Sequence, residues 1–128
     1  MEDDVTTPEG AVRAFLSCGT ERDWSRAEEL LTADITRIGP DGDVKSGRVD
    51  YLAFVRQALE EASYYSYEVR RMAVSQDGRV VLVEIDETLV EQSGDTVEVS
   101  EAMVFDLTAD LRISRLSVYA RTDPAKAD

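Results

Sequence analysis

Apolar and polar side chains alternate along four segments of residues 64–121, and this pattern limits the possible folds more than any other feature of the chain. A two-residue period predicts β-strands that bury one face. The segments cover residues 64–76, 79–91, 96–108 and 111–121. Turn-forming sequences separate them, such as Asp77-Gly78 in the first gap. The second half of the chain is therefore predicted to form a meander of four antiparallel strands.

The first half of the chain follows a helical period. Val12, Phe15 and Leu16 recur at the spacing of one helix face, which predicts a helix over residues 8–21 with Thr7 as its N-cap. The other elements expected in this half are a second helix capped by Asp23, a short strand over 35–39, a turn over 39–43 and a third helix over about 49–62. Together these elements predict an α+β fold, in which three N-terminal helices pack in a strongly curved antiparallel sheet.

The length and composition suit a single domain. The chain has 128 residues, of which 43% are hydrophobic, enough to build one core. The domain is expected to span residues 1–128, with its core over about 8–121 and a frayed polar tail at 122–128. No apolar run is long enough to cross a bilayer, and the acidic N-terminus does not resemble a secretion signal. With one cysteine, Cys18, these features predict a cytoplasmic protein without a membrane partner.

Charge and the absence of histidine exclude several classes of function. The net charge of −13 disfavours binding to nucleic acid or anionic membranes, but it does not repel a small apolar ligand. Without histidine, Ser-His-Asp and Cys-His catalysis and histidine-ligated zinc are excluded. No calcium-loop spacing and no glycine-rich phosphate loop is present, so neither a metal nor a cofactor is expected. Acid–base chemistry would then depend on Asp, Glu, Tyr, Lys or a bound water.

Glu101 is the strongest candidate for a functional side chain. The two-residue alternation places Val99, Met103 and Phe105 on its side of the strand, and Glu101 is the only charge there. An unpaired carboxylate buried among apolar groups costs several kcal/mol, so it must be neutral, paired or facing a cavity. Glu101 therefore indicates a pocket, although it does not name a reaction.

The pairing of the neighbouring strand decides which acid accompanies Glu101. A bulged turn at Gly94 would pair odd residues with odd residues and place Glu87 on the same inner face. Glu87 would then lie opposite or diagonal to Glu101, and two carboxyls this close would raise the pKa of one of them. A slip of one residue would replace Glu87 by Glu84 and Asp86.

Three stretches of the chain resemble the nuclear transport factor 2-like fold, and within it the steroid Δ-isomerase-like and SnoaL-like polyketide cyclase branch. They are AVRAFLSCGTERDWSRAEELLTADI for the paired N-terminal helices, GPDGDVKSGRVDYLAF for the strand, turn and third helix, and SEAMVFDLTADLRISRLSVYA for the closing strands. The resemblance covers about residues 8–121. It implies a curved sheet wrapped around helices, which forms a cone with a pocket.

The resemblance also implies where site residues would fall. The carboxylate base of a steroid isomerase would fall at Gly39, and its two tyrosines would fall at Phe15 and Val55. The acid of the epoxide-hydrolase and cyclase relatives would fall near Val118. A steroid isomerase also uses a protonated aspartic acid, which would fall at Glu101. The resemblance therefore implies a carboxylic acid at this position, with glutamate in place of aspartate.

These considerations together define an expected pocket. Its lining is expected to include Phe15, Val55, Tyr65, Ile85, Met103 and Val118. Arg37 is the expected counter-charge of Glu101, because alternation along the first strand turns it to the pocket side, and Arg56 is the second choice. In a catalytic pocket, Glu101 would be the acid or base, Glu87 its partner and Arg37 an anion stabiliser.

Two functions are compatible with this pocket. The first is a SnoaL-like or steroid-isomerase-like protein that binds or transforms a small, largely apolar molecule by acid–base isomerisation, cyclisation or epoxide opening. The second is a non-catalytic module of the same fold that binds a ligand or a protein, because three isomerase positions lack their functional groups.

The outer face of the sheet predicts a homodimer. Val80, Leu82 and Val90 share the outer face of one strand, and Ala102 and Val104 share that of its neighbour. Helices can cover only the concave side, and an uncovered apolar face tends to associate. The closed arrangement for identical chains is a two-fold dimer, which would form here through the outer sheet face.

Overall fold

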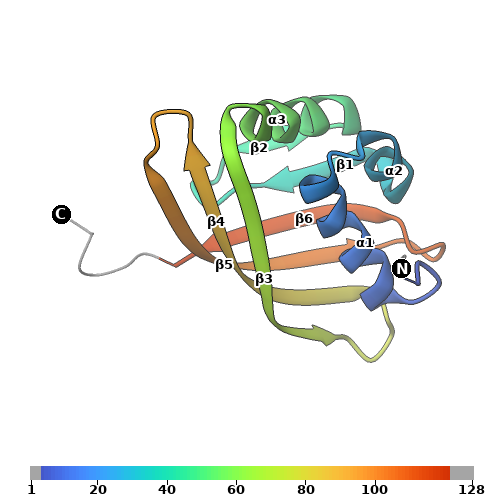
Figure 1. Cartoon of the computed structure of the whole chain (residues 1–128). Coiled ribbons are helices and arrows are strands. Elements are labelled where there is room, and N and C mark those ends of the chain that lie inside the picture. The colour runs from blue at the N-terminus through green and yellow to red at the C-terminus, as the bar shows by residue number, and fades with distance from the viewer. Residues whose placement is uncertain (1–3, 122–128) are drawn as a thin grey trace.

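The computed structural model describes residues 4–121, which form three helices and one six-stranded sheet. The strands follow the order β2-β1-β6-β5-β4-β3 across the sheet, which curls strongly without closing (Figure 1). The strands are β1 (Leu31–Ile38), β2 (Val44–Ser46), β3 (Ala62–Val74), β4 (Val80–Glu91), β5 (Thr96–Leu107) and β6 (Ile113–Ala120).

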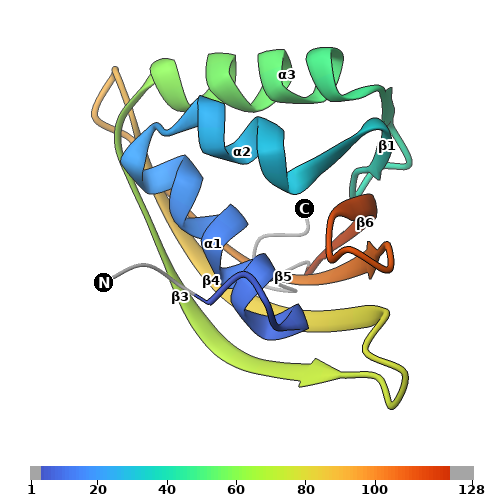
Figure 2. The ribbon, with the colours of Figure 1, turned by 90° about the vertical axis from the view of Figure 1, so that its right-hand side faces the viewer.

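The helices lie on the concave side of this sheet. They are α1 (Pro8–Glu21), α2 (Trp24–Leu30) and α3 (Arg48–Glu60). Figure 2 shows α1 within the curve of the long strands and α3 across the upper end of the same curve. The predicted α+β fold, with three helices in a strongly curved sheet, is confirmed.

Local signals in the sequence account for the helix starts. The Thr7 hydroxyl accepts a hydrogen bond from the Gly10 amide at 3.0 Å, and the Asp23 carboxylate accepts one from the Arg26 amide at 3.2 Å. Both side chains thus satisfy backbone donors that the first helical turn leaves free. The two predicted N-caps are confirmed.

The sheet differs from the prediction at its N-terminal edge. β1 begins at Leu31, earlier than the expected start at residue 35, because α2 ends at Leu30 and the chain extends at once. Residues 44–46 were expected to lead directly into the third helix, but they form β2 beside β1. β1 also runs parallel to β6, so the sheet is not wholly antiparallel. A three-residue strand is too short for its period to be recognised.

The core fills the space between α1 and the inner face of the sheet. Phe105 is completely buried, and its ring meets that of Phe15 edge-on at 6.1 Å between centroids. Val81 and Leu116 flank Phe105 on the neighbouring strands and are also completely buried. This core anchors α1 against β4, β5 and β6, and so fixes one wall of the space above it.

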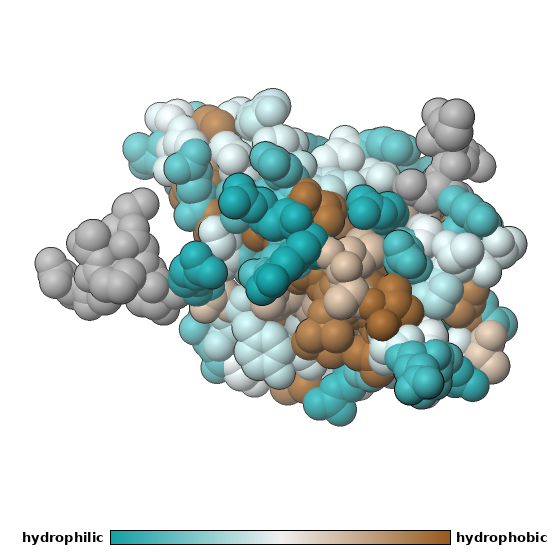
Figure 3. All heavy atoms as spheres, turned by 90° about the horizontal axis from the view of Figure 1, so that it is seen from below, coloured by the Kyte–Doolittle hydropathy of each residue, from teal (hydrophilic) through white to brown (hydrophobic). Residues whose placement is uncertain are grey.

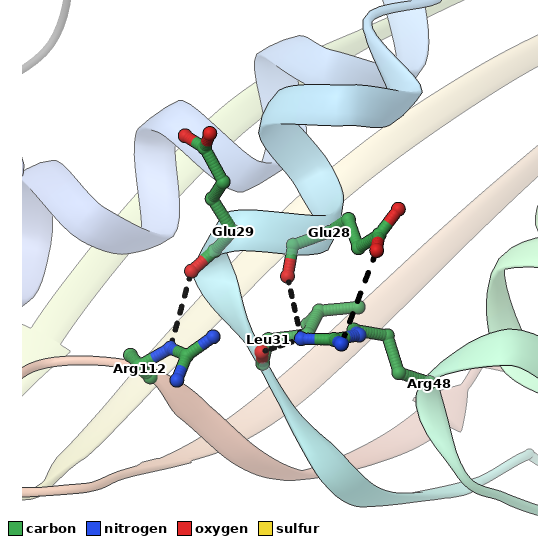
Figure 4. Close-up of polar contacts among 5 residues, drawn as sticks. All are labelled: Glu28, Glu29, Leu31, Arg48 and Arg112. Atoms are coloured by element: carbon green, nitrogen blue, oxygen red, sulfur yellow. Dashed lines mark hydrogen bonds and ion pairs between the residues drawn. The ribbon is translucent and has the colours of Figure 1, made fainter.

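Two arginines from other elements satisfy the C-terminal end of α2. Arg48 donates hydrogen bonds from Nη1 to the carbonyl oxygens of Glu28 and Leu31, both at 3.2 Å, and Arg112 donates to the carbonyl of Glu29 at 3.2 Å (Figure 4). Helix ends leave carbonyls without partners and carry partial negative charge, so guanidinium groups stabilise them. The contacts tie the short helix to α3 and to the start of β6.

The outer face of the sheet carries uncovered hydrophobic side chains. Figure 3 shows a hydrophobic patch with hydrophilic surroundings on the underside of the molecule, where the sheet turns beneath α1. Leu82 is 48% exposed, and Val104 lies directly beside it on β5. Within the residues described, no helix covers this face, as the sequence predicted.

Candidate functional site

A cavity of about 210 Å³ lies between the three helices and the inner face of the sheet. Of the residues predicted for the site, most line this cone cavity: Phe15, Arg37, Val55, Tyr65, Glu87, Glu101, Met103 and Val118. Residues that are distant in the sequence are thus brought together at one place.

Ile85 is the exception among the predicted lining residues. It is only 1% exposed, and the structure does not place it among the residues that line the cone cavity. α1 packs against β4, and Ile85 is part of the hydrophobic core. The free inner surface of β4 lies further along, at Glu87 and Leu89.

The strand register places Glu87 on the inner face. Odd residues of β4 pair with odd residues of β5, with Ile85 beside Glu101 and Glu87 beside Val99. Glu87 is therefore the diagonal neighbour of Glu101, as the bulged-turn prediction stated. Glu84 and Asp86 lie on the opposite face, which rules out the alternative register.

Glu87 and Tyr65 form the central polar contact of the cavity. The Tyr65 hydroxyl donates a hydrogen bond to Glu87 Oε2 at 2.5 Å from the adjacent strand β3. Burial raises the pKa of the Glu87 carboxyl, although the Tyr65 hydrogen bond and the nearby Arg37 charge act in the opposite direction. The expected cause was repulsion by Glu101, whereas the main cause is burial. Glu87 thus combines a perturbed pKa with a hydrogen-bond donor.

Tyr51 adds a hydroxyl group to the same cavity. It begins the second turn of α3, is 5% exposed, and stacks on Phe15 with 6.3 Å between ring centroids. Burial raises the pKa of its hydroxyl, which the charges of Arg37 and Glu87 also influence. Within residues 4–121 this hydroxyl has no hydrogen-bond partner. The hydroxyl is not among the fully buried polar atoms without a partner, where only Thr32 Oγ1 is found in the described residues, so it is open to the cavity and available to a ligand.

Arg37 is paired with Asp43 rather than with Glu101. Its Nη1 lies 3.0 Å from the Asp43 carboxylate, and its guanidinium lies 5.0 Å from the centre of the Phe54 ring. The pair passes over Gly39, where any side chain would collide with it. The predicted Glu101–Arg37 pair is therefore wrong, because the β1–β2 turn supplies a closer carboxylate.

Arg56, the second choice of counter-charge, lies outside the cone cavity. It forms an ion pair with Glu60 at 3.0 Å, one helical turn away on α3, and its side chain is 59% exposed. Within residues 4–121, Glu101 itself has no hydrogen bond or ion pair to another side chain. Glu101 is partly exposed at the edge of the cavity, and not fully buried as its strand position had suggested.

A larger hollow of about 590 Å³ crosses the outer face of β3–β6. Four of its lining residues form two ion pairs, Arg70 with Asp86 at 3.1 Å and Arg71 with Glu84, and Glu101 lines this hollow as well as the cone cavity. Such exposed pairs contribute little energy. The smaller cone cavity is the better candidate, because ligand sites are concave, mostly apolar and supplied with few polar groups.

Sequence reasoning missed several residues of the cavity. Tyr51 lies in the range expected for the third helix, and the signal that could have found it is its hydroxyl, since a buried tyrosine hydroxyl usually needs a partner. Asp43 was not assigned to Arg37, because it lies in the turn that leads into the unpredicted strand β2. Trp24, at the start of α2, also lines the cavity.

Two further observations concern the described residues. In the range 4–121, no cluster of three or more His, Cys, Asp or Glu side chains is arranged to hold a metal ion. None of the helices in this range has the length and apolar character needed to span a membrane.

Solved structures place this helix-filled, curled sheet in the nuclear transport factor 2-like class. SalBIII, an epoxide hydrolase/cyclase-like enzyme with a role in pyran ring formation in the polyether salinomycin, matches with a TM-score of 0.80 and 19% identity over 90% of this chain and 91% of its own. A Shewanella denitrificans OS-217 protein named as a SnoaL-like polyketide cyclase matches with a TM-score of 0.79 and 11% identity, over 89% and 90% of the two chains. A Mycobacterium tuberculosis LEH-like epoxide hydrolase matches with a TM-score of 0.75 and 20% identity, over 87% and 80%. At these identities the likeness establishes the fold.

The sequence itself defines the family. The model of the SnoaL-like domain matches residues 12–116, and the chain belongs to this family. Among curated proteins, none matches the sequence significantly.

Proposed function

We propose that the protein binds a small, largely apolar molecule in the cone cavity and catalyses a proton transfer on it, with Glu87 as the acid–base group. The observation that supports this proposal is the Glu87–Tyr65 hydrogen bond inside a mostly apolar cavity. Burial raises the pKa of the Glu87 carboxyl above its ordinary value, and a carboxyl held in this way is suited to proton transfer. The sequence favoured Glu101 for this role, but Glu87 is the acid that has a hydrogen-bond donor, the Tyr65 hydroxyl, inside the cavity.

The other polar groups have roles that follow from their contacts. Tyr65 is a positioning residue, because its hydroxyl holds the Glu87 carboxyl. The free hydroxyl of Tyr51 would donate a hydrogen bond to a substrate oxygen as negative charge develops there. In such a step a substrate C–H bond breaks, its proton moves to Glu87, and the electron pair moves to the oxygen beside Tyr51. The reverse transfer to another carbon completes an isomerisation.

Relatives support a proton-transfer reaction without specifying it. Among the structures of this fold are the epoxide hydrolase/cyclase-like SalBIII and an LEH-like epoxide hydrolase. Ring closure and epoxide opening both require a proton to be delivered or removed, and carboxyl groups can do this. The same fold can also serve binding alone, so the chemistry must be tested on this chain.

A proton-transfer activity can be measured without knowledge of the natural substrate. We expect the protein to accelerate deuterium exchange next to the carbonyl of a single-ring ketone in heavy water, followed by NMR. Two probes are used: the neutral cyclohexanone and the amine-bearing 1-methyl-4-piperidone. Glu87→Gln should reduce the exchange rate by about 10²–10⁴-fold, the usual contribution of a general base.

The matched control is Glu98→Gln, which removes an exposed carboxylate from the same sheet. It should exchange at the rate of the unmodified chain. If the unmodified chain does not exceed the background rate for either ketone, but a ligand still binds in the cavity, the non-catalytic alternative gains support. Equal rates for Glu87→Gln and the unmodified chain would remove Glu87 from the mechanism.

We further infer that two copies pair through the outer sheet face. The support is the hydrophobic patch around Leu82 and Val104, together with Tyr119, which is 61% exposed on the same face (Figure 3). A dimer would shield this area from water. The net charge of −13 opposes association, so screening by salt should favour the dimer.

The dimer is tested by sedimentation at micromolar concentration. We expect the unmodified chain to form a dimer, and Val104→Glu to shift it to the 14.2 kDa monomer, because the new charge would be buried in the interface. Val49→Glu, at a site on α3 that is 80% exposed, is the control and should remain dimeric. A single 14.2 kDa species for the unmodified chain would contradict the inference.

A further inference from the structure

The cone cavity contains more acidic than basic side chains. The strongly ionisable residues that line it are Arg37, Glu87 and Glu101. Arg37 is engaged by Asp43 at 3.0 Å. Across residues 4–121, by contrast, neither glutamate forms an ion pair. Arg37 is near enough to favour the charged form of Glu87, but its charge is already shared with Asp43. The cavity therefore presents carboxyl groups that lack a cation of their own.

The two glutamates are diagonal neighbours on the inner face of the sheet. Ile85 lies beside Glu101 in the register, and Glu87 follows two residues later on the same face of β4. Diagonal neighbours of this kind in an antiparallel pair are about 7–8 Å apart. Both glutamate side chains line the same cavity, so one cationic nitrogen can lie between them.

Aromatic rings surround this acidic pair. The aromatic residues that line the cavity are Phe15, Trp24, Tyr51, Phe54 and Tyr65. The face of an aromatic ring is electron-rich and attracts cations, including quaternary ammonium groups. The Phe54 ring is already contacted by cations, because Arg37 and Lys45 each lie 5.0 Å from its centre. The rings left for a positively charged ligand are those of Phe15, Trp24, Tyr51 and Tyr65.

The hydroxyl of Tyr51 provides an independent indication of a missing polar partner. The residue is 5% exposed, lines the cavity, and has no hydrogen-bond partner within residues 4–121. Glu87 lines the same cavity. Its oxygen can accept a hydrogen bond from a protonated amine that also contacts Glu87.

We propose that the cone cavity selects small organic cations, namely single-ring molecules that place an ammonium group between Glu87 and Glu101 and their ring against the aromatic wall. The size follows from the volume: a cavity of about 150 Å³ holds one benzene ring, and this cavity measures about 210 Å³. Larger multi-ring ligands generally need pockets of about 300–1,000 Å³. The net charge of −13 would also draw cations toward the protein. The inference rests on the site described under the proposed function and specifies the charge and size of its ligand.

The test compares ligands of one shape and different charge. Benzyltrimethylammonium is the cationic probe, neopentylbenzene its neutral isostere and phenylmethanesulfonate an anionic analogue. Trp24 is the single tryptophan of the chain and lines the cavity, so its fluorescence reports occupancy directly. At physiological salt, which confines surface attraction to about 8 Å, we expect the cation to bind about tenfold or more tightly than the neutral isostere. The anion should not bind.

Two double variants distinguish binding of the cation in the cavity from its attraction to the acidic surface. In the double variant Glu87→Gln, Glu101→Gln, the affinity for the cation should fall about tenfold or more, while the affinity for the neutral isostere should not. Retained binding of the isostere shows that the cavity is still folded. The control Glu68→Gln, Glu98→Gln removes two exposed carboxylates and should leave both affinities unchanged.

Each contrary outcome overturns the inference. These outcomes are equal or tighter binding of the neutral isostere, unchanged cation affinity in the double cavity variant, and no change in Trp24 fluorescence with any of the probes. The measurement is an equilibrium affinity and needs no turnover. If the cation does not bind preferentially, the ketone-exchange result is unaffected. If the protein does not accelerate ketone exchange, the measured preference for cations is unaffected.

Discussion

Replacement of Phe105 by alanine is expected to lower the free energy of unfolding by about 3–5 kcal/mol, the range for a large aromatic side chain removed from a core. Phe105 is completely buried between Val81 and Leu116, and its ring contacts Phe15 at 6.1 Å between centroids. No neighbour can readily fill the space, because strands on both sides fix the backbone. The loss is measured from urea unfolding as a shift of the midpoint with little change of slope.

The same substitution should also disturb the candidate site. Phe15 packs between Phe105 and Tyr51, so loss of the Phe105 ring removes the support of one cavity wall. The control Val49→Ala alters a side chain that is 80% exposed and should change the stability by less than about 0.5 kcal/mol. A loss below about 1 kcal/mol for Phe105→Ala would show that the core is not packed around this ring.

The fold could be predicted from the sequence because its period is strong. The long strands β3, β4 and β5 have enough residues to show alternation, and α1 has both a capping threonine and an apolar stripe. The odd-to-odd register of β4 and β5 was favoured by its more apolar inner face, but alternation alone left a slip of one residue open until the strand pairing was known. The N-terminal edge of the sheet could not be predicted from the sequence. β2 is too short for a period, and the parallel contact of β1 with β6 joins distant parts of the chain.

The candidate site was only partly predictable, and for a physical reason. Alternation decides which face of a strand a side chain occupies, but the helices decide how deeply it is covered. Glu101 and Ile85 share an inner face, yet α1 buries Ile85 while Glu101 remains at the cavity edge. Alternation also does not decide which group a charged side chain pairs with. The contact of Arg37 with Asp43 depends on the turn between β1 and β2, which sequence periodicity does not describe.

Glu87 links the site to the pH dependence of stability. It faces Tyr65 and Tyr67 on β3, and Arg37, Tyr51 and Glu101 line the same cavity from β1, α3 and β5. Burial raises its pKa above its ordinary value, so the folded protein holds this proton to higher pH than the unfolded chain. Where the folded state binds more protons, stability falls as pH rises. The loss of stability caused by ionisation of Glu87 is absent below the pKa of Glu87 in the unfolded chain and complete above its pKa in the folded protein.

Glu87→Gln should therefore stabilise the protein at neutral pH and have little effect in acid. Glutamine keeps the shape and a carbonyl oxygen that accepts the Tyr65 hydrogen bond, but it cannot ionise. The difference in unfolding free energy between variant and unmodified chain should grow as pH rises from about 4 to about 8, by about 1.4 kcal/mol for each unit by which the folded pKa is raised. Urea unfolding at a series of pH values measures it, and the contributions of the other carboxyls cancel because both chains share them. A difference that stays constant with pH would mean that Glu87 ionises in the folded protein as readily as in water, and would also weaken the case for Glu87 as the proton-transferring group.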